Sequence, residues 1–148
     1  MDIKDKIVVV TGAAGGIGQA LAERFHAAGA KKIICADVNA EGAKATAAKI
    51  DGIGWGVNVT SEAEIKAMID GVEDQVGPID LFCCNAGILV PGGPEVPNDD
   101  WQRIWEINVM AHIWAARHMV PKMIARGGGY FLNTASAAGL LSQVGSAP

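Results

Sequence analysis

A glycine-rich segment near the amino end restricts the fold of this chain more than any other feature. Residues 11–18 read Thr-Gly-Ala-Ala-Gly-Gly-Ile-Gly and lie between an apolar run and a pattern with helical spacing. Gly12, Gly16 and Gly18 allow a tight turn, a close approach of the backbone to a ligand, and close packing of a helix on a strand. The free N–H groups at the start of the helix favour an anion. The segment predicts a strand–turn–helix unit that binds a pyrophosphate; a turn that binds nothing is the alternative.

Apolar runs and helical patterns alternate along the rest of the chain. Ser61, with Glu64 three residues on, predicts a capping box at the start of one helix. Strict alternation of strands and helices implies right-handed crossovers and a parallel sheet with helices on both faces, in a single domain over residues 1–148. Strands are expected at residues 6–10, 33–36, 55–59, 79–84 and 130–134, and helices at residues 17–28, 40–50, 61–76 and 99–126, the last interrupted near residues 106–108.

Charge and composition argue against several classes of function. The net charge of −4 offers no basic surface for nucleic acid, and the amino end lacks the pattern of a secretion signal. No apolar run approaches the roughly 20 residues that span a bilayer. The cysteines have no disulfide spacing, which predicts buried thiols in a reducing compartment. His26, His112 and His118 have no metal-ligand spacing, so we interpret them as surface or interface residues and expect no metal site. The sequence favours a cytoplasmic protein.

Asp37 follows the second expected strand, 19 positions after Gly18. A carboxylate at this place accepts hydrogen bonds from the ribose hydroxyls of adenosine and repels a 2′-phosphate. Neither the glycine segment nor the two residues after Asp37 supply a lysine or arginine to hold such a phosphate, and Lys31 and Lys32 fall at the opposite end of the strand. The sequence therefore predicts NAD rather than NADP. A carboxylate that only caps a turn is the alternative interpretation.

The spacing Thr-Gly-x3-Gly-x-Gly resembles that of the short-chain dehydrogenase/reductase family, and differs from the Gly-x-Gly-x2-Gly of other Rossmann dehydrogenases. The resemblance covers the whole chain. It implies a Rossmann-like, three-layer, doubly wound α/β fold, with the five strands in the order 3-2-1-4-5. It also implies that the loop binds the cofactor through Thr11, Gly12, Gly16, Ile17 and Gly18.

Two further motifs follow in register with the family. Asn58 and Val59 stand where the family has Asp-Val, whose carboxylate contacts the adenine amino group. An amide keeps an acceptor oxygen but loses the charge, so we expect a weaker contact. Asn85, Ala86 and Gly87 match the Asn-Ala-Gly that ends the family's fourth strand and lies beside the nicotinamide ribose. A simple turn is the competing interpretation of those three residues.

Two side chains match the catalytic positions of the family. Asn108, in Ile-Asn-Val, matches the asparagine that helps to hold a water in the proton relay, although a mid-helix asparagine alone is more often solvated or marks a kink. Ser136, just past the fifth expected strand, matches the serine whose hydroxyl hydrogen-bonds the substrate oxygen as charge develops there. Ser142 and Ser146 lie too far past the strand to compete.

The tyrosine and lysine that carry the acid–base step in the family have no counterpart in this sequence. The tyrosine would follow Pro148, and the sequence's one tyrosine, Tyr130, precedes Ser136 and has Thr134 where the lysine should be. The resemblance implies a chain truncated before its last strands, which binds NAD but is inactive alone.

The favoured function is an NAD(H)-dependent oxidoreductase that transfers a hydride between nicotinamide and an alcohol or carbonyl carbon. A non-catalytic NAD-binding regulatory module would use the same cofactor residues, but it gives no reason for Asn108 and Ser136. A methyltransferase shares the strand–helix alternation, and the glycine spacing argues against it.

Expectations about partners are less specific. Large apolar residues recur between positions 101 and 123 at helical spacing, and by resemblance this helix forms a homodimer or homotetramer, unless its side chains only cover the sheet. The loop at residues 88–97 carries one charge, Glu95, which favours an uncharged alcohol as substrate. The identity of the substrate and the direction of the reaction stay open.

Overall fold

The computed structural model describes residues 1–140 and residue 145, so that Ser142 and Ser146 lie outside the described residues. Its centre is one parallel sheet in the predicted order β3-β2-β1-β4-β5. The strands are β1 (Ile7–Thr11), β2 (Lys32–Asp37), β3 (Ile53–Gly56), β4 (Leu81–Cys84) and β5 (Tyr130–Asn133). The helices are α1 (Gly16–Ala27), α2 (Ala40–Ala48), α3 (Glu62–Gln75), α4 (Asn98–Trp105) and α5 (Ala111–Ala125). A π-helical turn, η1 (Glu106–Met110), joins α4 to α5, and a 3₁₀ turn, η2 (Ala137–Gly139), follows β5.

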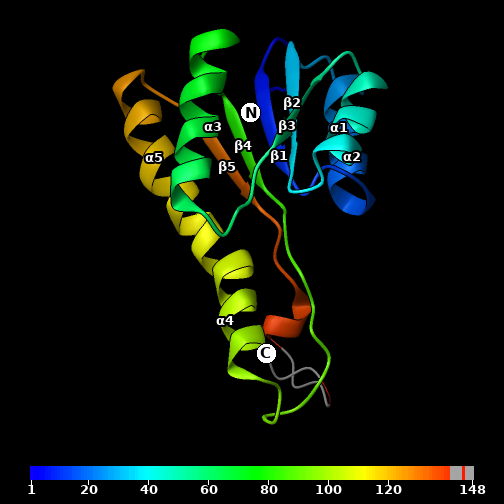
Figure 1. Ribbon diagram of the computed structural model, residues 1–148. Helices are drawn as coiled ribbons and strands as arrows, with labels where there is room; N and C mark the ends of the chain where they lie inside the picture. The colour runs from blue at the N-terminus through cyan, green and yellow to red at the C-terminus, as the bar shows by residue number, and fades with distance from the viewer. Residues whose placement is uncertain (141–144, 146–148) are drawn as a thin grey trace.

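Helices cover both faces of the sheet, which gives the three layers expected (Figure 1). Helices α1 and α2 pack on one face, and α3 and α5 pack on the other. Side chains of a strand alternate between the faces, so Val8 and Val10 belong to the core beside α1 and α2, while Ile7 and Val9 belong to the core beside α3 and α5. A strand buried on both faces has to be apolar throughout, which explains the continuous apolar run of β1.

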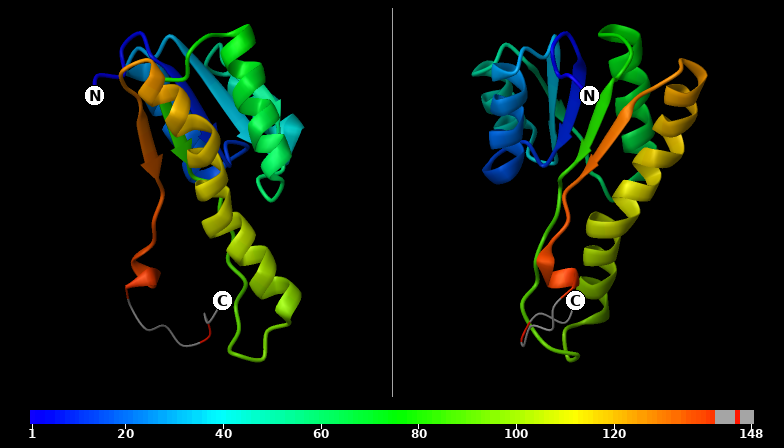
Figure 2. Two further views of the ribbon diagram at one scale, coloured as in Figure 1. Left: turned by 90° about the vertical axis from the view of Figure 1, so that its left-hand side faces the viewer. Right: turned by 180° about the vertical axis from the view of Figure 1, so that it is seen from behind.

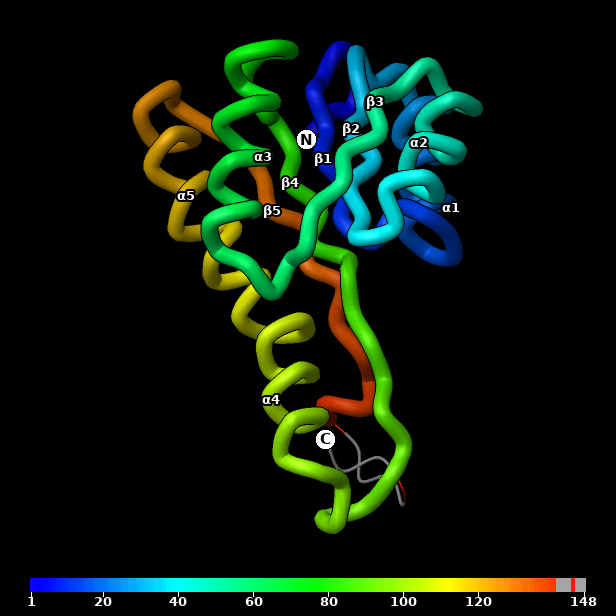
Figure 3. Tube along the Cα trace, in the orientation of Figure 1, coloured from blue at the N-terminus to red at the C-terminus, as the bar shows by residue number. Residues whose placement is uncertain are grey.

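The carboxyl ends of the parallel strands meet at one edge of the sheet. Strand pairing places Thr11 beside Ala36 and Cys84 beside Asn133, so the residues that follow these strands gather at this edge. Helix α4, the loop after β4 and the chain after β5 project beyond the same edge in every view (Figures 2 and 3). In open α/β sheets, ligands bind in the crevice outside these strand ends.

The third strand is shorter and earlier than the sequence predicted. It spans Ile53–Gly56 instead of residues 55–59, because its ladder with β2 ends at the pair Asp37 and Gly56. Val57 is nevertheless buried, and Val59 packs against the core beside α3 and α5. The apolar character of these two residues reflects packing after the strand has ended.

The long helical region is interrupted as predicted. The interruption is η1, which lies between α4 and α5 and contains the expected break near residues 106–108. Within the described part of the chain, no helix is long and apolar enough to cross a membrane.

Candidate functional site

The turn between β1 and α1 depends on its glycines. Gly12 has a φ of 68°, and a Cβ there would lie 2.9 Å from the Cα of Ala86. A Cβ at Gly18 would lie 2.1 Å from the carbonyl oxygen of Gly12, so neither position tolerates a side chain. At Gly15 and Gly16, by contrast, a Cβ would have no described atom within 4 Å. The turn packs tightly on the sheet on one side and is open to a ligand on the other.

The start of α1 carries no anion of its own. Its N-cap, Gly15, makes no side-chain cap, and the first turn contains no acidic residue. Helices α2 and α3 differ, because the side chains of Asn39 and Ser61 cap them. Uncapped N–H groups and the positive end of a helix dipole attract phosphate. The residues present therefore fit the pyrophosphate of a dinucleotide.

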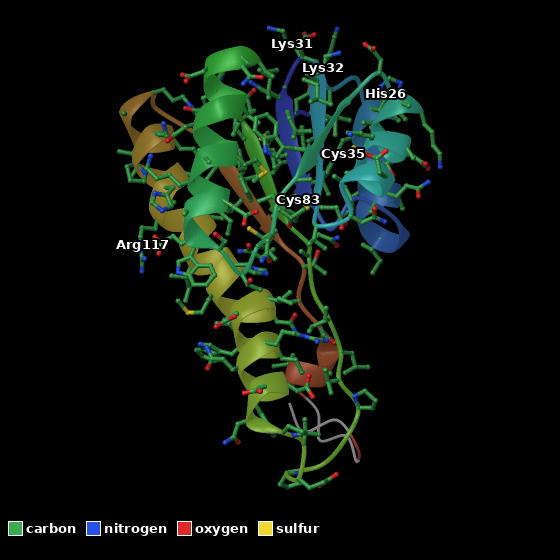
Figure 4. The ribbon with its side chains drawn as sticks, viewed as in Figure 1. His26, Lys31, Lys32, Cys35, Cys83 and Arg117 are labelled. Atoms are coloured by element: carbon green, nitrogen blue, oxygen red, sulfur yellow. The ribbon has the colours of Figure 1, made fainter. Side chains whose placement is uncertain are left out.

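Asp37 ends β2 beside this turn. Its Oδ2 accepts a hydrogen bond from the Ala14 N–H at 3.0 Å, and its Oδ1 accepts one from the Asn39 N–H at 2.9 Å. Each carboxylate oxygen keeps capacity for a further donor, such as a hydroxyl. Lys31 and Lys32 lie at the opposite end of the sheet (Figure 4), as the sequence predicted.

A first cleft, with a volume of about 430 Å³, opens beside Asp37. It brings the predicted cofactor residues Asn58 and Val59, which follow β3, together with Asp37 and Gly12. Helix α4 adds a cation to this cleft, Arg103, that the sequence analysis did not place there. The cleft is lined by Gly12, Asp37, Val38, residues 57–60, residues 86–88, Arg103, Glu106 and Ile107.

Thr11 and Asn85 join the ends of three strands. The hydroxyl of Thr11 accepts hydrogen bonds from the N–H groups of Asn85 and Ala86, at 2.9 and 3.1 Å, and donates to the carbonyl of Cys83 at 3.3 Å. The Asn85 side chain donates to the carbonyl of Thr11 at 3.1 Å and accepts from the hydroxyl of Thr134 at 3.0 Å. The Asn85 side chain thus fastens β1 and β5 to β4.

Asn108 lies in the π-helical turn η1. Its Oδ1 accepts a hydrogen bond from the Ile88 N–H, and its Nδ2 donates to the Ile88 carbonyl. Single π-helical turns inside α-helices frequently mark functional sites. Both ends of this amide hold the loop after β4 in place.

A second cleft, of about 460 Å³, lies between the ends of β4 and β5. It brings Asn108 and Ser136 together, as the sequence predicted, and it shares Ala86, Gly87 and Ile88 with the first cleft. The two clefts therefore adjoin at these residues, at the carboxyl edge of the sheet. The second cleft is lined by residues 85–88, Asn108, His112 and residues 133–136.

Ser136 is held by the turn that it begins. Its Oγ accepts a hydrogen bond from the Ala138 N–H at 3.1 Å, at the start of η2. Among the described residues no acceptor takes the hydroxyl hydrogen, so it can be donated to a ligand in the second cleft.

His112 is a member of the second cleft that the sequence analysis missed. It was expected on the surface or at an interface, and it lines this open cleft, with its Nδ1 3.2 Å from the Asn133 Oδ1. The signal was its position four residues after Asn108, because that spacing puts two side chains on one side of a helix. Across the residues that the structure describes, no group of three or more His, Cys, Asp or Glu side chains is placed to hold a metal ion.

Comparison with known proteins decides the family. The sequence model of the family described as short chain dehydrogenase matches residues 6–148. The chain belongs to the short-chain dehydrogenase family. Members of this family generally bind NAD or NADP.

Relatives in this family come from several bacteria. The chain is 36% identical to 1-deoxy-11-beta-hydroxypentalenate dehydrogenase of Streptomyces exfoliatus, with 99% of this chain and 56% of that protein covered. It is 37% identical to the CLA biosynthesis dehydrogenase/reductase of Lactiplantibacillus plantarum, with 97% and 52% covered. It is 36% identical to D-threitol dehydrogenase of Mycolicibacterium smegmatis, with 90% and 53% covered. The chain thus spans about half the length of these curated relatives.

A solved structure shares the fold. A crystal structure described as ribose-5-phosphate isomerase from Brucella melitensis 16M superposes with a TM-score of 0.90 at 29% identity. The match covers 95% of this chain and 55% of the other. The short-chain dehydrogenase chain described here therefore has an arrangement of strands and helices already seen in a crystal.

Proposed function

We propose that this short-chain dehydrogenase family member is an NAD(H)-dependent oxidoreductase that transfers a hydride between nicotinamide and the carbon of an alcohol or carbonyl substrate. The observation that carries the proposal is that the two clefts adjoin, since Ala86, Gly87 and Ile88 line both of them. The first cleft begins at Asp37 and the second ends at Ser136. A dinucleotide along this edge of the sheet would have its adenosine in the first cleft and its nicotinamide in the second.

The cofactor in this proposal is NAD. The uncapped N–H groups of α1 hold the pyrophosphate, and the carboxylate of Asp37 accepts hydrogen bonds from the adenosine ribose hydroxyls. The same carboxylate repels a 2′-phosphate. A cation in the first cleft, Arg103, would favour NADP. However, it belongs to α4, where its guanidinium nitrogen lies 3.9 Å from a carboxylate oxygen of Asp100 and is therefore paired within its own helix.

The second cleft orients the substrate. When bound, NAD supplies the hydride acceptor. Ser136 donates its hydroxyl hydrogen to the substrate oxygen, and the amide of Asn108 fixes the loop that lines both clefts. The residues known to line this cleft include no Asp, Glu, Lys or Arg, which favours a neutral alcohol or carbonyl compound.

By resemblance to the family, the acid–base step is carried by a tyrosine that follows Ser136 in the sequence. The sequence contains one tyrosine, Tyr130, which pairs with Leu81 at the start of β5, whereas Ser136 follows the other end of that strand. We therefore expect residues 1–148, taken alone, to bind NAD as one unit without turning over substrate.

The proposal is tested with the protein purified from its natural source, supplied with NAD and a panel of neutral secondary alcohols. NADH formation is expected, and Ser136→Ala should lower kcat/KM about 100-fold, because one hydrogen-bond donor to the reacting oxygen is lost. NAD affinity should stay within about twofold, since the serine contacts the substrate side. The matched control, Ser61→Ala, changes only the cap of α3. If Ser136→Ala leaves kcat/KM unchanged, the role of Ser136 as the donor to the substrate oxygen is wrong.

A second copy of the chain is the proposed partner. Of the apolar residues on the long helical region, Met119 is buried and Trp114 packs against the core, whereas Trp105, Ile113 and Val120 remain 54%, 43% and 37% exposed. Exposed apolar surface of this kind suits association. Light scattering should show a dimer or tetramer, and a monomer at micromolar concentration would contradict the proposal.

The buried free cysteines suit a reducing compartment, so the cytoplasm is the proposed location.

A further inference from the structure

Asn58, at the end of the first cleft, has a side chain whose orientation is fixed by its neighbours. Its Oδ1 accepts hydrogen bonds from the N–H of Thr60 at 3.0 Å and from the hydroxyl of Thr60 at 2.9 Å. A backbone N–H can only donate, so the oxygen of the amide, and not its nitrogen, must face Thr60. The acceptor that the sequence analysis assigned to adenine is therefore already used within the protein.

The backbone of Asn58 is also fully engaged. Its N–H donates to the Oε2 of Glu64 at 2.8 Å, and its carbonyl accepts from the N–H of Ser61 at 3.0 Å. Only one half of the capping box expected at Ser61 therefore forms. The Ser61 hydroxyl accepts a hydrogen bond from the Glu64 N–H, but the Glu64 carboxylate accepts one from the N–H of Asn58 instead of that of Ser61. These bonds lock the turn between β3 and α3.

The amide NH₂ of Asn58 is the remaining polar group of this residue. Among the described residues it has no hydrogen-bond partner, and Asn58 is exposed at the first cleft. Two apolar side chains, Val38 and Val57, line the same cleft. The end of β3 therefore offers a hydrogen-bond donor next to apolar surface, which suits the edge and the face of a heterocyclic base.

The strand order places this donor where the base would lie. If the pyrophosphate sits at α1, after β1, and the ribose at Asp37, the last residue of β2, the base attached to that ribose extends outward to the end of β3. Resting on the proposed NAD binding, we propose that Asn58 sets the base specificity of the site: it offers a donor, and no acceptor, to the 6-position of the purine.

The consequence is a loss of preference for adenine. Adenine carries an amino group, a donor, at its 6-position, and two donors that face each other cannot hydrogen-bond. Hypoxanthine carries a carbonyl oxygen there, which accepts a hydrogen bond from the Asn58 amide. Nicotinamide hypoxanthine dinucleotide should therefore compete with NAD, whereas an aspartate at position 58 would offer a second carboxylate oxygen to the adenine amino group.

The experiment is a pair of calorimetric titrations of the protein, one with NAD and one with nicotinamide hypoxanthine dinucleotide. For the natural protein the Kd of nicotinamide hypoxanthine dinucleotide should be equal to that of NAD or up to about tenfold lower, because only hypoxanthine accepts a hydrogen bond from the Asn58 amide. For Asn58→Asp the ratio should move at least about tenfold in favour of NAD. Asn58→Asp keeps an oxygen facing Thr60, so the turn should be preserved.

Asn39→Asp is the matched control. It adds the same charge one strand away, and aspartate still caps α2, so it should change both affinities together and leave their ratio unaltered. If the natural protein binds NAD at least about tenfold more tightly than nicotinamide hypoxanthine dinucleotide, the role proposed for Asn58 is wrong, while the proposed binding of NAD still holds. If neither dinucleotide binds, the proposed function fails, and the inference fails with it.

Discussion

The side-chain amide of Asn108 pairs with the main chain of Ile88 in both directions, with 2.9 Å for each hydrogen bond. An amide side chain thus does for the loop after β4 what a neighbouring strand does inside the sheet. Ile88 belongs to both clefts, so η1 sets the position of the wall that they share. The asparagine acts on the site through the backbone of this loop.

Asn108→Ala should release that loop. The Ile88 N–H loses its acceptor, and its hydrogen exchange with solvent should accelerate about tenfold, the effect of one lost hydrogen bond. Exchange measured at single amides by NMR checks this. Asn108→Asp keeps an oxygen for the Ile88 N–H and should preserve most of its protection. Equal exchange in the natural protein and in Asn108→Ala would show that other contacts hold the loop.

Thr11 supplies the acceptor for two backbone N–H groups, those of Asn85 and Ala86. Thr11→Val has nearly the same shape but leaves both groups unpaired, so the free energy of unfolding should fall by about 2 kcal/mol or more. Thr11→Ser retains the hydroxyl and should cost less than about 1 kcal/mol. Urea denaturation of both variants makes the comparison. A valine variant as stable as the serine variant would contradict the assigned role.

Much of the site was predictable because it follows from strand ends. Asp37, Asn85 and Ser136 come directly after, or close after, strands that apolar runs identify, and parallel strands bring such residues to one edge. The position of β3 was less predictable. Apolar residues mark burial, and the burial of Val57 continues past the last residue paired with β2.

Side-chain partners could not be predicted from spacing. The sequence pattern around Ser61 and Glu64 is that of a reciprocal cap, but the carboxylate binds the N–H of Asn58, which the turn brings within 2.8 Å. The place of His112 in the second cleft was not predicted for the same reason: it depends on how closely α5 approaches the end of β5. Such contacts are decided by packing between elements far apart in the sequence.

The three cysteines should be chemically inert in the folded protein. Burial raises the pKa of Cys35 and Cys83 to about 11 and that of Cys84 to about 12. Iodoacetamide reacts with the thiolate, so no cysteine should be labelled near neutral pH without denaturant, and all should be labelled in denaturant. Mass spectrometry counts the adducts. The raised pKa values also make stability depend on pH. Above the ordinary thiol pKa of 9.0 the unfolded chain loses its thiol protons while the folded protein keeps them, so the free energy of unfolding falls as the pH rises.

An ion cluster joins α3 to α5 and should make stability sensitive to acid. Glu62 binds Arg117 at 2.8 Å and His118 at 2.9 Å. The hydrogen bond from Arg117, aided by that from His118, holds the pKa of Glu62 below its ordinary value of 4.5. A lowered carboxyl pKa stabilises the fold above that ordinary value and loses its effect as the pH falls through the folded pKa.

A double-mutant cycle isolates this contribution. Glu62→Gln and Arg117→Gln, alone and combined, should show a modest favourable coupling in the free energy of unfolding at neutral pH. The coupling should vanish at a pH well below 4.5, where Glu62 is protonated. A coupling that stays constant across this range would mean that the interaction does not depend on the charge of Glu62.

The central claim, that Asp37 and the glycine turn bind NAD, is tested most directly by comparing the Kd values of NAD and NADP by calorimetry. The natural protein should bind NAD at least about tenfold more tightly, because the Asp37 carboxylate repels the 2′-phosphate. Asp37→Asn keeps an oxygen for the Ala14 N–H but removes the negative charge, so it should reduce the difference between the Kd values of NAD and NADP. Equal affinity for the two cofactors, or no binding of either, would contradict the account.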